Sequence, residues 1–335
     1  MNYHEITLEM TIGDLVKSKV YGQFADYIFT YMTPDHWNCP LKEYGFDKVG
    51  FVPTLHRMEE LATTNENYIY HLYSEEEQLS EYDKQDPVFI HFPGPKPNQP
   101  YAVVIPGGGL NRQWGLIEGL AIAAHFNELG YSAFVLYYRV KQEPLMPKPL
   151  EDMYQCIRYI EDHAEQFQVQ KGRYIIGGFS AGATIAGEIG STNLGWMTAN
   201  VPKPEMIYLG YSAADMNGLY DAYMNAPEGS PARAGMAPFL KRIGGPFFTR
   251  ESLYPYHLLD FMDASYPPVY ITANEDDGTV PVVNSHVLDA KCTELGIPHV
   301  TNIGKKGGHS FGLGIGLEVE GWMEAAVKFW KNLKK

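Results

Sequence analysis

The sequence contains few cysteines, and those present lie far apart. Cys39, Cys156 and Cys292 are the only ones, and no Cys-x-x-Cys spacing occurs. This pattern excludes a disulfide framework and a zinc knuckle. The chain also lacks a basic start followed by an apolar run, and no stretch reaches the ~18 apolar residues of a membrane span. We therefore expect free thiols in a reducing compartment, no signal peptide and a cytoplasmic protein.

Positive charge is scarce as well. The chain has 26 lysines and arginines against 40 aspartates and glutamates, which gives a formal net charge of −14. Nucleic acids and anionic membranes are bound by basic surfaces, so we expect neither as a partner. Because no group of residues has the spacing of metal ligands, we expect no metal and no organic cofactor.

The remaining composition is that of a globular enzyme. The chain has 335 residues, of which 45% are hydrophobic and 20% charged, enough for one large α/β domain or two modest ones. From Tyr101 onward, short apolar runs alternate with helical patterns. Strands are predicted over 102–106, 133–138, 174–178, 206–210 and 269–273, and helices over 116–129, 150–164 and 319–333. This alternation predicts an α/β fold whose mostly parallel central sheet carries helices on both faces.

The chain is predicted to divide into an extension and a catalytic domain. Residues 1–85 are aromatic, polar and without clear periodicity, and we expect them to pack on a core formed by residues 86–335. The long connection 212–267 has two interpretations, a lid over a pocket or a surface excursion without a role.

The segment from Tyr174 to Gly187 predicts a nucleophile. It reads as an apolar strand, a sharp turn and a small-residue helix, with Ser180 at the turn between Gly178 and Gly182. This strand–turn–helix context is that of a nucleophile elbow, in which small residues are needed two positions either side of the serine. Ser212 also follows a strand but lacks the second glycine, so Ser180 is the candidate.

A serine nucleophile requires a base and an acid that orients it. In this type of fold the order along the chain is serine, acid, histidine. Glu275, Asp276 and Asp277 compete for the acid in the loop after the strand 269–273, and Asp277 is preferred, with Asp276 as its rival. His309, between glycines before the last helix, is the predicted base. The other histidines of this half lie in helix-like or strand-like contexts: His257, His286 and His299.

The oxyanion hole requires two backbone N–H groups. Ala181, directly after the nucleophile, is expected to supply one. Gly108 and Gly109 lie in a glycine run at the end of the strand 102–106 and are expected to supply the other. A phosphate-binding interpretation of this run lacks the flanking lysine and hydroxyl residues that a phosphate loop has.

Together these motifs resemble the α/β-hydrolase superfamily, and within it the bacterial carboxylesterases grouped with acetyl xylan esterases and feruloyl-esterase-like proteins. The resemblance is carried by Pro106–Gly109, Leu136–Arg139, Asp152, Gly178–Gly182, Asp277–Pro281 and Gly308–Gly312. Many related esterases have histidine where Pro106 stands, a change that leaves the backbone amides in place. The resemblance implies a structural role for Asp152. It leaves three roles open for residues 1–85: bracing the domain, shaping the pocket rim, or joining a second copy in a homo-oligomer.

The sequence thus predicts a serine carboxylesterase. The resemblance implies that the substrate carries a short acyl group, first of all acetyl, on a sugar or oligosaccharide. The 24 tyrosines provide aromatic rings of the kind that stack on sugar rings. Two alternatives are a peptidase of the prolyl-oligopeptidase type, for which residues 1–85 are too short to form the usual propeller, and a hydrolase-fold scaffold without catalysis.

Overall fold

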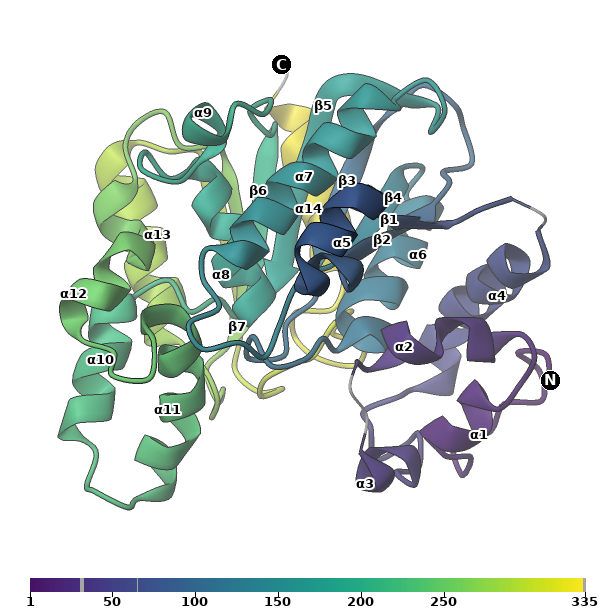
Figure 1. The fold of residues 1–335 in the computed structure, drawn as a ribbon, viewed down its shortest axis with the longest axis horizontal. Helices are drawn as coiled ribbons and strands as arrows, with labels where there is room; N and C mark the ends of the chain where they lie inside the picture. Colours follow the sequence, from purple (N-terminus) through teal and green to yellow (C-terminus); the bar gives the residue numbers. More distant parts are fainter. Residues whose placement is uncertain (31–32, 65, 334–335) are drawn as a thin grey trace.

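A single twisted sheet runs through the molecule (Figure 1). The computed structural model describes residues 1–30, 33–64 and 66–333. Within them the strand order is β1-β2-β4-β3-β5-β6-β7-β8. The pairs β1/β2 and β2/β4 are antiparallel, and the neighbours from β4 through β8 pair parallel. The strands are β1 (Ile69–His71), β2 (Val88–Phe92), β3 (Gln99–Ile105), β4 (Ser132–Tyr137), β5 (Val169–Phe179), β6 (Met206–Gly210), β7 (Val269–Asn274) and β8 (His299–Gly304). The predicted α/β fold with a mostly parallel sheet is confirmed.

The five predicted strands correspond to β3 through β7, and three strands were missed. The edge strand β8 is half-exposed along most of its length and contains His299, Thr301 and Asn302, so it lacks a continuous apolar run. The strand β1 has three residues, and β2 is fully buried but interrupted by His91. Residues 69–71 of the predicted extension form β1 and pair with β2, so part of this segment belongs to the sheet.

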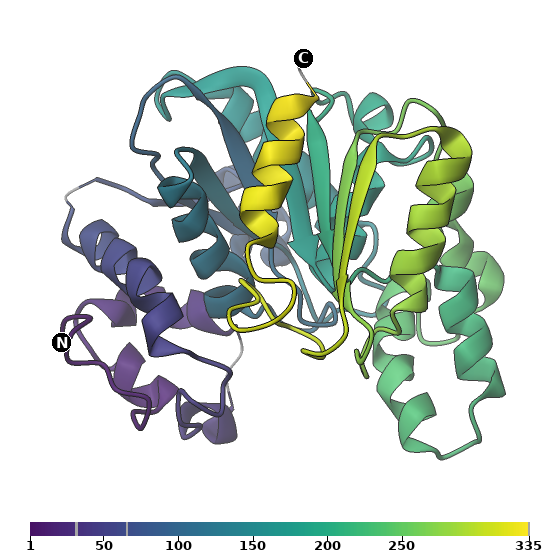
Figure 2. The same ribbon diagram turned by 180° about the vertical axis from the view of Figure 1, so that it is seen from behind.

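Helices cover both faces of the sheet, as predicted. One face packs against α7, α8 and α13, and the other against α6 and α14, while α4 packs on α6; Figure 2 shows α14 lying across the sheet. The α-helices are α1 (Ile12–Val16), α2 (Ala25–Ile28), α3 (Pro34–Trp37), α4 (Lys48–Thr63), α5 (Glu75–Ser80), α6 (Ala121–Glu128), α7 (Lys148–Asp162), α8 (Ala181–Gly187), α9 (Trp196–Ala199), α10 (Met216–Asn225), α11 (Pro231–Gly244), α12 (Arg250–Leu253), α13 (Val283–Leu295) and α14 (Trp322–Asn332). None of the helices in the described ranges combines the length and apolar composition needed to cross a membrane.

Two helical groups project beyond the sheet on opposite sides (Figure 1). One consists of the N-terminal helices, and the other of α10 and α11, which lie within the predicted lid segment 212–267. The segment is thus largely helical and contains its own packed aromatic residues, such as Tyr223 against Phe248 at 5.0 Å between ring centroids. Whether it acts as a lid stays a prediction.

Candidate active site

Ser180 lies in a strained turn between β5 and α8. Its backbone has φ 51° and ψ −123°, a conformation that residues with a side chain rarely adopt. The two flanking glycines allow the close approach of β3. A Cβ atom added to Gly178 would lie 2.4 Å from the carbonyl oxygen of Ile105, and one added to Gly182 would lie 2.1 Å from the same oxygen. The turn therefore has the geometry of a nucleophile elbow, with the small residues where the motif requires them.

The fold brings Ser180, His309 and Asp277 into contact. Nε2 of His309 lies 2.9 Å from Oγ of Ser180, and its Nδ1 lies 2.6 Å from Oδ2 of Asp277. The second carboxylate oxygen of Asp277 accepts hydrogen bonds from the amides of Thr279 and Val280 at 2.8 and 2.9 Å. The Asp277 side chain is fully buried, so the loop holds this carboxylate in one orientation toward the imidazole.

The rival residues take other positions. Asp276 accepts the Gly308 amide at 2.8 Å and so supports the loop that carries His309 without contacting the imidazole in the described structure. Glu275 lies 3.5 Å from His286. Ser212 is buried, and its hydroxyl finds no hydrogen-bond partner in the described ranges. His257 and His299 pair with other acidic residues, Asp215, Asp260 and Asp289.

The glycine loop lies directly beside the nucleophile. A Cβ atom on Gly107 would be 2.8 Å from the Cβ of Ser180. Within the described ranges the amides of Gly108, Gly109 and Ala181 donate to no acceptor, whereas the Gly107 amide donates to Glu118 at 2.8 Å. Free amides on the glycine loop and at the first turn of α8 are what an oxyanion requires.

Sequence reasoning missed Glu118. This carboxylate is fully buried in a π-helical turn, Leu116–Leu120, between the glycine loop and α6. Its partners include the Tyr211 hydroxyl at 2.9 Å and the Gly107 amide, and burial raises the pKa of Glu118 against the opposing effect of these donors and of His309. A glutamate inside the apolar run Leu116–Ala124 was the available signal, because such a residue needs buried partners.

Both flanking helical groups contact the loop that follows the glycines. From the N-terminal side, the Tyr44 ring stacks on Trp114 with centroids 5.2 Å apart. From the other side, the Arg242 guanidinium at the end of α11 donates to Oδ1 of Asn111 at 3.0 Å. Residues 1–85 and 212–267 therefore both contact the loop that follows the glycines.

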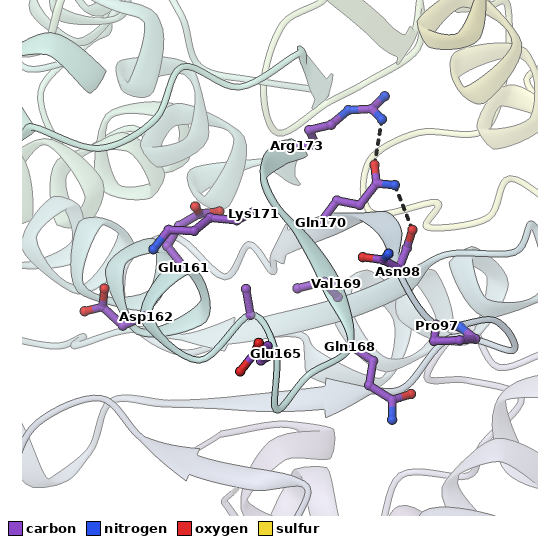
Figure 3. Close-up of a pocket in the computed structure, with 11 residues that line it drawn as sticks. Pro97, Asn98, Glu161, Asp162, Glu165, Gln168, Val169, Gln170, Lys171 and Arg173 are labelled. Atoms are coloured by element: carbon purple, nitrogen blue, oxygen red, sulfur yellow. Dashed lines mark hydrogen bonds between the residues drawn. The ribbon is translucent and has the colours of Figure 1, made fainter.

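The structure has other concave surfaces away from Ser180. A groove of about 970 Å³ is lined by Glu161, Asp162, Glu165, Lys171 and Arg173 among others, and Figure 3 shows these residues. The groove lies at the start of β5, so the length of that strand, roughly 30 Å at about 3.3 Å per residue, separates it from Ser180 at the other end. Within the described ranges, no three His, Cys, Asp or Glu side chains gather as a metal-binding group.

Comparison with known proteins assigns the family. A sequence model of the BD-FAE family matches residues 90–292, more than half of the chain. The chain belongs to the BD-FAE family. It is also 28% identical over 224 residues to an endo-1,4-beta-xylanase B of Butyrivibrio fibrisolvens, in a match that covers 66% of this chain and 34% of that protein. The chain thus spans about a third of the length of this relative.

Solved structures agree on the fold of this BD-FAE protein. An acetyl ester-xyloside bifunctional hydrolase from Caldicellulosiruptor lactoaceticus has a TM-score of 0.65 and 22% identity, covering 79% of this chain and 96% of its own. A sugar hydrolase from Lactococcus lactis has a TM-score of 0.59 and 19% identity, and the match covers 74% of this chain and 96% of that protein. A carboxylesterase from Lactobacillus plantarum has a TM-score of 0.58 and 18% identity, and the match covers 74% of this chain and 92% of that protein. The predicted α/β-hydrolase fold is confirmed, and family and fold together support the prediction of an ester hydrolase.

Proposed function

We propose that this protein is a serine carboxylesterase that removes short acyl groups, first of all acetyl, from sugars or oligosaccharides. The observation that carries the proposal is the continuous set of contacts from Asp277 through His309 to Ser180, beside free amides on the glycine loop and α8. The xylan-related and sugar-related names of the relatives support a carbohydrate ester as substrate.

The mechanism follows from the positions of these groups. Neutral His309 accepts the Ser180 proton through Nε2 while the Ser180 oxygen attacks the ester carbonyl. Asp277 fixes the tautomer in which Nδ1 carries hydrogen and stabilises the imidazolium that forms. The amides of Ala181 and Gly108, assisted by Gly109, stabilise the oxyanion. His309 then protonates the leaving alcohol, and a water molecule, activated in the same way, releases the acid.

Covalent labelling tests the chemical step. A fluorophosphonate probe should label the wild-type protein and fail to label Ser180→Ala, whose ester hydrolysis should fall by on the order of 10⁶ in turnover. A wild-type protein that does not label is a scaffold. If the variant retains more than a few per cent of the activity, Ser180 is not the nucleophile, and Ser212 becomes the next residue to replace.

A substrate panel tests the second half of the proposal. Release of acid is measured from acetylated xylo-oligosaccharides, acetylated monosaccharides, aryl esters of increasing acyl length, and prolyl peptides. We expect the highest kcat/KM on acetylated sugars. Preference for peptides would replace the esterase by the peptidase alternative, and preference for long aryl esters would remove the sugar from the proposal.

A further inference from the structure

We propose that Glu118 is a positioning residue of this active site: its carboxylate ties the oxyanion loop to the loop that carries His309 and stabilises the imidazolium. The proposal rests on the proposed serine esterase function. It concerns a buried carboxylate that the three-residue mechanism does not use.

Glu118 is an unusual residue for its place. The turn Leu116–Leu120 is buried at every position, and the Glu118 side chain has no exposed surface. A carboxylate in such surroundings loses its hydration, and that loss is expensive unless donors replace the water. Inserted π-helical turns often occur at functional sites. The burial of Glu118 is therefore explained by its contacts, all of which lead toward the active site.

The first contact fixes the glycine loop. Oε2 of Glu118 accepts the Gly107 amide at 2.8 Å, and the Gly107 carbonyl accepts the Trp114 amide at 3.1 Å. Gly107 is held at both its polar groups and cannot rotate without breaking one of these bonds. The following amides, of Gly108 and Gly109, keep their direction as a consequence.

The second contact reaches the histidine loop. Oε1 of Glu118 accepts the Tyr211 hydroxyl at 2.9 Å, and the same hydroxyl accepts the Gly312 amide at 3.4 Å. The Tyr211 ring packs edge-on against the His309 imidazole with centroids 4.6 Å apart. One carboxylate thus supports both the oxyanion loop and the loop that carries the base.

The charges around His309 give the third part of the argument. Asp277 contacts the imidazole directly, and Glu118 is separated from it by Tyr211, whose hydroxyl donates to Glu118 and whose ring packs against His309. The other titratable groups that face Glu118 are the phenols of Tyr211, Tyr138 and Tyr44, which are neutral at neutral pH. The Gly107 amide and the Tyr211 hydroxyl both donate to Glu118, as suits an ionised carboxylate, which can only accept. The negative charge of this carboxylate favours the imidazolium that forms when Ser180 attacks.

The experiment separates this charge from ordinary structural support. In Glu118→Gln the amide oxygen can still accept from Gly107 and the amide nitrogen can donate to the Tyr211 oxygen. The shape and both pairings are kept, the Tyr211 hydrogen bond is reversed, and the charge is lost. We expect kcat for an aryl acetate to fall about 10- to 100-fold with little change in KM. The acid limb of the kcat/KM profile should move to lower pH, because the imidazolium loses a nearby anion.

Glu161→Gln is the matched control. Glu161 is also buried and also accepts a tyrosine hydroxyl, from Tyr101 at 2.6 Å, and a glycine amide, from Gly172 at 2.8 Å, but it lines the groove at the far end of β5 (Figure 3). This variant should keep the wild-type kcat and pH profile.

Tyr211→Phe keeps the carboxylate and cuts only the arm to the histidine loop, so it should lower kcat and leave the acid limb in place. If Glu118→Gln does not fold, this variant decides the positioning role. An active wild-type enzyme whose Glu118→Gln and Tyr211→Phe variants behave like Glu161→Gln would overturn the proposal. So would a Glu118→Gln variant that loses activity with an unmoved acid limb. A wild-type protein without esterase activity fails the proposed function itself, which is a distinct result.

Discussion

Gly107 and Ser180 are in such close contact that no side chain fits between them: a Cβ atom on Gly107 would lie 2.8 Å from the Cβ of Ser180 and 2.4 Å from the Phe179 carbonyl oxygen. Gly107→Ala should therefore push the glycine loop away from the nucleophile and lower kcat by about 100-fold, a loss that a displacement of about 1 Å is sufficient to cause. Gly235→Ala is the control, because a Cβ there meets open space. Equal turnover in the two variants would show that the loop tolerates displacement and is not the oxyanion site.

Asp277 and Asp276 are adjacent but should differ in function. Asp277→Asn should cost about 10⁴ in turnover, since an amide facing Nδ1 favours the wrong tautomer of His309. Asp276→Asn removes only a charge from the carboxylate that accepts the Gly308 amide and should cost at most a few fold. Both are measured by kcat at a pH where His309 is neutral. A larger loss in Asp276→Asn would reverse the assignment of the acid.

The two phenylalanines after α11 should separate substrate choice from stability. Phe247 is 92% exposed, whereas Phe248 is half-buried and packs against Tyr223. Phe247→Ala should change the preference between sugar and aryl acetates and keep the melting temperature. Phe248→Ala should lower the melting temperature, because it removes packing. An identical substrate profile for Phe247→Ala and the wild type would argue against a lid role for this part of residues 212–267.

Glu188 should make stability depend on pH. Burial raises its pKa from 4.5 to about 8, so the folded state keeps a proton that the unfolded state has already released. The folded state binds more protons between these values, and the free energy of unfolding therefore falls as pH rises from about 4.5 to 8, by at most about 1.4 kcal/mol per pH unit. Glu188→Gln cannot titrate, so its melting temperature should fall less than that of the wild type between pH 5 and 8. An equal fall of the melting temperature with pH in the two proteins would contradict this account.

Local patterns in the sequence were sufficient for the sheet interior and the elbow. Strands buried on both faces leave continuous apolar runs, and the elbow needs small residues at fixed positions around Ser180, so both can be read from short segments. The edge strand β8 could not be predicted in this way, because its half-exposed, polar residues are held by pairing with β7.

The sequence by itself indicated the types of residue in the candidate active site and their order along the chain, because an elbow, a glycine run and a glycine-flanked histidine are local features. Only the tertiary structure distinguished Asp277 from Asp276, since the two differ in which one reaches the imidazole and which one supports the loop. Only the tertiary structure revealed Glu118, whose partners Gly107 and Tyr211 lie 11 and 93 residues away in the sequence. A glutamate within an apolar run indicates that buried partners are needed, but which residues these are depends on how distant segments of the chain pack.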